Sequence, residues 1–152
     1  MRTFHHSFVV ATPIDKVWDF YTDLHHLEII TPKRLDLQII ESSSDRISLG
    51  QTASFSSRLL TRVTWNATIT ICKPYTYADE MSNHALFKHW RHTHAFHKIN
   101  EDQTKIDDEI EFELRYGFVG KMFEWYALDK LKKIFAYRQQ KTIETLNKSE
   151  TS

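Results

Sequence analysis

The chain has 152 residues, with 20 Lys and Arg against 20 Asp and Glu, so its formal charge is zero when the histidines are neutral. This balance argues against nucleic-acid binding, which needs a basic excess to neutralise phosphates. Aromatic residues form 13% of the chain, and glycine and proline number three each, which argues against disorder. We expect one domain over residues 1–146 and a flexible tail at residues 147–152.

Targeting signals and cofactor motifs are not evident in the sequence. Cys72 is the single cysteine, the first residues do not resemble a secretory leader, and no apolar run approaches the roughly 20 residues of a membrane span. A glycine-rich phosphate loop is also missing. We therefore expect a cytoplasmic protein with no integral membrane association, no nucleic-acid partner and no cofactor.

The first third of the chain predicts one strand and two short helices. Apolar residues alternate with polar ones over Thr3–Ala11, which is typical of a half-buried strand. Thr12 followed by Pro13 predicts a helix N-terminus, and helical spacing continues to Tyr21. A second helix is predicted over His26–Ile30 and should end near Pro32.

The period changes to two from Leu35 onwards, which predicts a meander of antiparallel strands. With the first strand the total is seven, and the six predicted here are Arg34–Ser42, Gln51–Leu60, Arg62–Lys73, Tyr75–Ser82, Phe87–Asn100 and Thr104–Tyr116. From Val119 to Leu146 the pattern is helical, and it predicts one long helix that closes the chain.

A single stripe of the long helix is predicted to face the sheet. Its members recur at intervals of three and four: Phe123, Ala127, Leu131, Ile134, Phe135, Arg138 and Thr142. Arg138 stands where a leucine is expected. Either it extends its charge to the edge of the core or pairs with a carboxylate there, or it orients an anionic ligand at a cavity mouth. Trp125 and Tyr137 lie off this stripe and would form a cavity entrance or a homodimer face.

Two histidines and one aspartate form the candidate polar cluster. Trp90, His92, His94 and Phe96 are spaced by two, so they project from one face of the sheet. On the next predicted strand Asp108 is the one carboxylate among inward apolar residues, and a hairpin would bring it towards the histidines. A buried carboxylate needs such a donor.

Several roles for this cluster stay open at the level of sequence. Asp108 and a histidine can form a structural hydrogen bond, a polar spot in a ligand cavity, or an acid–base pair. His92 and His94 can also aim two imidazoles at one metal ion, with Asp108 as a third ligand. Structural zinc sites usually include cysteine or a fourth ligand, so no metal is expected.

Four groups of residues resemble motifs of one known superfamily. They are Thr12-Pro13-Ile14 with Val17-Trp18-Asp19-Phe20, Leu27-x-x-Ile30-Thr31-Pro32, Trp90-x-His92-x-His94-x-Phe96 and Phe135-x-Tyr137-Arg138. Together with the order of elements, they are similar to the cyclase/dehydrase-like or ligand-binding branch of the START-like, or SRPBCC, superfamily. The resemblance covers almost the whole chain. It implies an α+β helix-grip fold, with a curved seven-stranded antiparallel sheet around a long C-terminal helix.

That resemblance implies a cavity between the sheet and the long helix, occupied by a small hydrophobic or aromatic, lipid-like or polyketide-like ligand. An enzyme of the cyclase/aromatase or dehydrase kind, with His92 or His94 as base, is the alternative; a packed domain with a partner surface is the third. The candidate ligand-binding residues are Phe8, Val10, Trp65, Ile69, Trp90, His92, His94, Phe96, Asp108, Ile110, Phe112, Phe123, Leu131 and Arg138.

Overall fold

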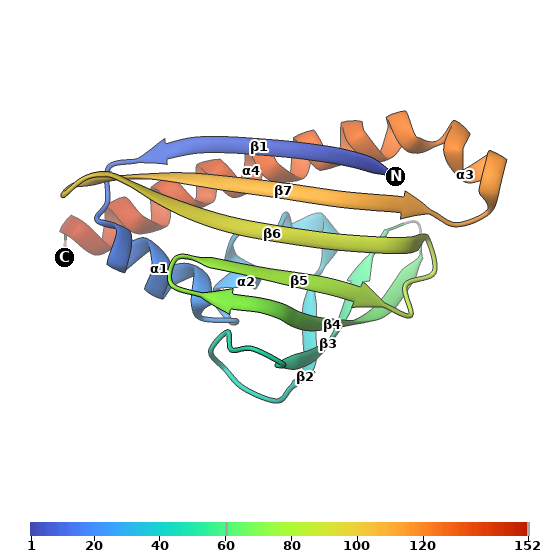
Figure 1. Cartoon of the computed structure of the whole chain (residues 1–152), viewed down its shortest axis with the longest axis horizontal. Coiled ribbons are helices and arrows are strands. Elements are labelled where there is room, and N and C mark those ends of the chain that lie inside the picture. The colour runs from blue at the N-terminus through green and yellow to red at the C-terminus, as the bar shows by residue number, and fades with distance from the viewer. Residues whose placement is uncertain (60, 152) are drawn as a thin grey trace.

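Seven antiparallel strands form one curved sheet in the order β1-β7-β6-β5-β4-β3-β2 (Figure 1). The computed structural model describes residues 1–59 and 61–151. The predicted seven-stranded meander is confirmed, and its strands are β1 (Arg2–Val10), β2 (Gln38–Ser42), β3 (Thr52–Arg58), β4 (Arg62–Lys73), β5 (Thr76–Ser82), β6 (Phe87–Asn100) and β7 (Gln103–Leu114).

Helices cover the inner face of this sheet. The long helix α4 (Glu124–Thr151) passes behind β1, β7 and β6, with α3 (Gly117–Met122) at one end of the molecule (Figure 1). The helices α1 (Ile14–Thr22) and α2 (His26–Ile29) lie towards the other end. Within the described ranges, no helix combines the length and apolar character needed to cross a membrane.

The first helix begins one residue later than predicted, because Pro13 and not Thr12 occupies its N-cap. The carbonyl of Pro13 accepts hydrogen bonds from the amides of Lys16 and Val17. Thr12 is 1% exposed, and its carbonyl accepts a hydrogen bond from the hydroxyl of Thr104 at 2.8 Å. Thr12 therefore ties the start of α1 to β7 and does not cap the helix.

The predicted strand over Arg34–Ser42 is wrong in its first part and correct from Gln38 onwards. Lys33–Leu35 form a 3₁₀ turn, and β2 begins only at Gln38. Asp36, directly after the turn, has a left-handed backbone with φ 44°, which ends regular structure there. The alternation of apolar residues in the sequence does not reveal such a turn. The predicted end of the next strand, at residue 60, lies outside the described residues.

The predicted single C-terminal helix is two helices, which meet at Phe123. Tyr116 has a left-handed backbone with φ 70°, and the amide of Phe123 bonds to the carbonyl of Gly120 in a tighter turn. The second helix extends through Thr151, so residues 147–151 of the predicted tail are helical. Residue 152 lies outside the described residues.

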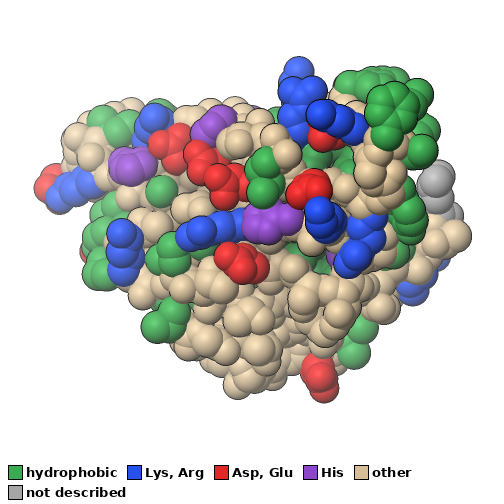
Figure 2. All heavy atoms as spheres, turned by 45° about the vertical axis from the view of Figure 1, so that its right-hand side comes forward, with side chains coloured by type: hydrophobic (Ala, Val, Ile, Leu, Met, Phe, Trp, Pro, Cys, Tyr) green, Lys and Arg blue, Asp and Glu red, His purple; other side chains and the backbone are tan. Residues whose placement is uncertain are grey.

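The two long central strands separate charge from the interior. Along β7 the inward side chains are buried, whereas the outward row carries Asp107, Glu109, Glu111 and Glu113. Acidic and basic side chains accordingly gather over the outer face of the sheet (Figure 2). This alternation confirms which face of β6 and β7 meets the helices.

Gly120 is required where α3 approaches the end of β7. A Cβ added there would lie 2.0 Å from the carbonyl oxygen of Arg115, which belongs to the backbone and cannot rotate away. We expect Gly120→Ala to lower the free energy of unfolding by about 1–3 kcal/mol in urea titrations followed by circular dichroism.

The matched control is Phe118→Ala in the same helix, because the Phe118 side chain is 78% exposed. It should change the free energy of unfolding by about 0.5 kcal/mol or less. Equal stability of Gly120→Ala and the unsubstituted protein would contradict the close approach of α3 to β7.

Candidate functional site

The predicted cluster of two histidines and an aspartate is assembled at the centre of the sheet. The β6–β7 register pairs His94 with Asp108 and His92 with Ile110. The Nε2 atom of His92 lies 2.8 Å from Oδ1 of Asp108, and Nδ1 of His94 lies 3.2 Å from the same oxygen. The Asp108 side chain has no exposed surface, so both imidazoles serve a carboxylate shut off from water.

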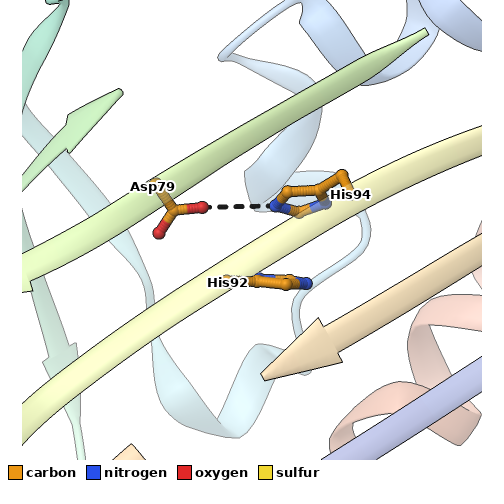
Figure 3. Close-up of side chains that lie close together, drawn as sticks. All are labelled: Asp79, His92 and His94. Atoms are coloured by element: carbon orange, nitrogen blue, oxygen red, sulfur yellow. Dashed lines mark hydrogen bonds and ion pairs between the residues drawn. The ribbon is translucent and has the colours of Figure 1, made fainter. Parts of the chain in front are cut away.

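Asp79 on β5 joins this cluster, and the sequence interpretation missed it. Its Oδ2 atom lies 3.2 Å from Nε2 of His94, so that His94 stands between two carboxylates. In Figure 3 Asp79 points from β5 towards His94, while the ring of His92 lies beside that of His94. The available signal was that Asp79 shares its strand face with Tyr77 and Met81, as one polar residue between two apolar ones.

Burial and neighbouring charges shift the pKa values of the two histidines in opposite directions. Burial, together with the charge of His94, lowers the pKa of His92 to about 4. Burial also opposes a charge on His94, but hydrogen bonds and charge from Asp108 and Asp79 outweigh it and raise the pKa of His94. Although burial opposes their ionisation, both imidazoles hold the pKa of Asp108 well below its usual range.

These pKa directions assign the protons of the cluster. A carboxylate can only accept, so His92 donates its Nε2 proton to Asp108 and keeps Nδ1 as an acceptor. His94 faces a carboxylate with each nitrogen, and these carboxylates raise its pKa. The centroids of the two imidazoles are 3.7 Å apart, and Tyr77 stacks on His94 at 4.2 Å. Two imidazoles whose pKa values are shifted in opposite directions thus lie side by side.

The same residues bring together a possible set of metal ligands. Asp79, His92 and His94 each offer one ligand atom, and these atoms lie within 4.8 Å of one another. The sequence considered this chemistry with Asp108 as the third ligand. In the structure Asp79 takes that place, whereas Asp108 accepts a hydrogen bond from His92 and lies 3.2 Å from Nδ1 of His94.

A pocket of about 850 Å³ lies beside the cluster, between the sheet, α4 and the α1–α2 region. Eight of the predicted ligand-binding residues line it: Trp65, Ile69, Trp90, His92, His94, Phe123, Leu131 and Arg138. Further apolar side chains, which were not among the predicted ligand-binding residues, complete the walls: Leu24, Leu27, Ile30, Ile47, Phe55, Tyr77, Phe87, Ile134 and Phe135.

The other six predicted ligand-binding residues lie in the packed interior and do not line the pocket. Phe8, Val10 and Phe96 pack with α1, in the same apolar cluster as Val17. Ile110 and Phe112 pack around Phe135, and Asp108 lies behind the histidines. All six share the inner face of the sheet with pocket residues. These six residues do not line the pocket because other side chains, including those of α1 and α4, pack against them.

Exposed aromatic side chains surround one end of the pocket. Tyr116, Val119, Phe123 and Tyr126 line it, yet each is at least 45% exposed, so they form its rim. Figure 2 shows apolar side chains gathered at the upper right of the molecule. Phe123 was predicted to face the sheet, but it is 54% exposed because the helix breaks at this residue. Trp125 and Tyr137 do not line the pocket, and their place at an entrance or a homodimer face stays a prediction.

No protein family model and no curated protein matches this sequence. Several solved structures, however, are similar to this chain in fold. A START superfamily protein from Mycobacterium smegmatis is 8% identical, with a TM-score of 0.74 over 96% of this chain and 97% of its own. An aromatase/cyclase from Streptomyces sp. R1128 is 17% identical, with a TM-score of 0.69 over 98% and 93%.

Norcoclaurine synthase from Thalictrum flavum, solved in complex with dopamine and hydroxybenzaldehyde, is also similar in structure. It is 14% identical, and the match covers 97% of this chain and 87% of that one with a TM-score of 0.70. The chain therefore has the START-like, helix-grip fold that its motifs predict. At these identities the comparisons define the fold, and the chemistry has to be argued from this chain's own residues.

Titration of the two histidines tests the assignment of protons. We expect His92 to titrate near pH 4 and His94 above its ordinary value of 6.5, measured from the imidazole C–H signals by NMR. Folded His92 stays neutral where the unfolded ring takes up a proton, so its contribution to stability falls as the pH drops from 6.5 towards 4. The contribution of His94 runs the other way and is lost as the pH rises through its folded pKa.

Asp108→Asn should lower the pKa of His94, because it removes one of the two carboxylates that hold the proton there. Asp107→Asn is the control, since Asp107 lies on the outer face within 3.4 Å of Lys105. Joint titration of both rings near pH 6.5, or an unchanged His94 in Asp108→Asn, would refute the assignment.

Proposed function

We propose that this chain binds a small hydrophobic or aromatic ligand, lipid-like or polyketide-like, in the pocket between its sheet and α4. The observation that carries the proposal is the pocket itself. Its volume of about 850 Å³ lies within the usual range for small-molecule sites, and aromatic residues such as Trp65, Phe87 and Trp90 form its walls. Burying an apolar ligand against them gains roughly 25 cal/mol for each Å² removed from water.

The ligand's polar atoms would meet a small number of fixed groups. His92, His94 and Asp79 lie on the sheet side of the pocket, and Arg138 lies on the helix side. Such sparse polar groups orient a ligand within an otherwise apolar wall. The START-like and aromatase/cyclase structures that resemble this chain support an internal site of this kind.

A substitution that fills the pocket tests ligand binding. Ala67 on β4 lines the pocket, and Ala67→Phe would occupy part of its volume. With the fluorescent apolar probe N-phenyl-1-naphthylamine, we expect this change to weaken binding by about tenfold or more, which corresponds to 1.4 kcal/mol.

Ala95→Phe is the matched control, because Ala95 lies on β6 between two inward residues and points to the outer face. It should leave the affinity for the probe unchanged. If the unsubstituted protein does not bind the probe, or if both variants behave alike, the pocket is not a ligand site.

The second candidate is an acid–base enzyme of the cyclase/dehydrase kind, favoured by the protonation states of the cluster. Nδ1 of neutral His92 can accept a proton from a carbon acid in the pocket, while Asp108 holds the ring by its Nε2 proton at 2.8 Å. This assigns His92 as the base and Asp108 as the residue that positions it.

Turnover of a poly-β-ketone thioester tests this second function. We expect His92→Gln to lower turnover by about 10²- to 10⁴-fold while binding of N-phenyl-1-naphthylamine persists. His89→Gln is the control, since His89 is on the same strand outside the pocket lining. No turnover above the uncatalysed rate, or turnover that survives His92→Gln, would leave ligand binding as the function.

A further inference from the structure

We infer that the ligand of this pocket is an apolar or aromatic molecule that carries one negatively charged oxygen group, which Arg138 binds. The inference rests on the proposed ligand binding and specifies the class of ligand. Its basis is the set of polar atoms on the pocket wall that have no partner in the protein.

Arg138 is a buried cation with an unpartnered Nε–H donor. It is 8% exposed, it lines the pocket from α4, and its Nε atom is buried without a hydrogen-bond partner. Its guanidinium lies over the ring of Phe135 at 4.8 Å, a contact that orients the charge without using its N–H donors. No hydrogen bond or ion pair joins Arg138 to a carboxylate within residues 1–59 and 61–151.

Pairing with the nearby carboxylates does not explain why the charge of Arg138 is buried. Asp108 and Asp79 are engaged by the two histidines, and the charge of Arg138 reaches Asp79 only through space. An arginine whose sole role was to pair with them would approach within hydrogen-bond distance. A buried guanidinium N–H without a partner is costly to keep, and an anion in the pocket would satisfy it.

A second unpartnered donor on the pocket wall points to the same kind of ligand. Nε1 of Trp90 is buried without a hydrogen-bond partner, and Trp90 belongs to the apolar cluster that contains Phe135. An indole N–H and a guanidinium N–H can only donate. The ligand must therefore bring acceptors, and it meets two donors on the side of the pocket where Phe135 lies.

The charged residues that line the pocket are mainly basic. They are Arg34, Arg58, Arg115, Lys130 and Arg138, whereas the acidic residues in the lining are Asp23 and Asp79. The chain as a whole is neutral, so this excess is a property of the site and not of the composition. A basic rim attracts an anion to the pocket, and apolar walls retain the rest of the molecule.

Two matched probes isolate the charge. They are 1-anilinonaphthalene-8-sulfonate and its uncharged counterpart N-phenyl-1-naphthylamine, which differ by the sulfonate alone. We expect Arg138→Met to weaken binding of the sulfonate probe by about tenfold or more. The same substitution should weaken binding of the uncharged probe by less than about twofold. Lys132→Met, at an exposed position of α4, should change neither affinity.

The remaining outcomes separate this inference from the proposed function. If Ala67→Phe leaves the fluorescence of both probes unchanged, they bind elsewhere and the pocket function itself fails. If both probes require the pocket and Arg138→Met weakens them equally or not at all, ligand binding stands and the anionic class is overturned. Should Arg138→Met fail to fold by circular dichroism, Arg138→Gln provides the same comparison with a polar side chain.

Discussion

The carboxylate of Asp108 has no exposed surface, and the centre of the sheet is built around its need for hydrogen-bond donors. The β6–β7 register supplies His92 and His94 from the neighbouring strand. A slip of one residue would turn both rings to the outer face and leave a charge buried without a partner. The polar cluster therefore specifies the pairing of β6 with β7, and it also places two imidazoles with oppositely shifted pKa values beside the pocket.

This cluster marks the boundary between two halves of the interior. On one side the sheet packs directly on α1, through Phe8, Val10 and Phe96. On the other side the strands curve away from α4 and leave the pocket, with α3 at its rim. The left-handed backbone at Tyr116 and the close approach at Gly120 set the position of α3. One half of the interior is thus densely packed, while the other contains the pocket.

Arg138 connects the helix to the chemistry of the pocket. It occupies an inward position of α4, where burial of a cation is costly, and it faces a wall that carries the two histidines. The same residue stands at the end of the Phe-x-Tyr-Arg motif, so the motif provides both an aromatic contact and a charge. The proposed anionic ligand, the basic rim and the apolar walls form one consistent account of this face of α4.

The sequence by itself determined the seven strands apart from the start of β2, the inner and outer faces of β6 and β7, and the approach of Asp108 to the histidines, because alternation along a strand depends only on local geometry. It did not identify Asp79, whose partner depends on the β5–β6 register, nor the helix break at Phe123. It also could not separate Trp90, which lines the pocket, from Phe112, which is packed on the same face. Only the tertiary structure decided this, because sheet curvature and helix position determine which inward side chains another element covers.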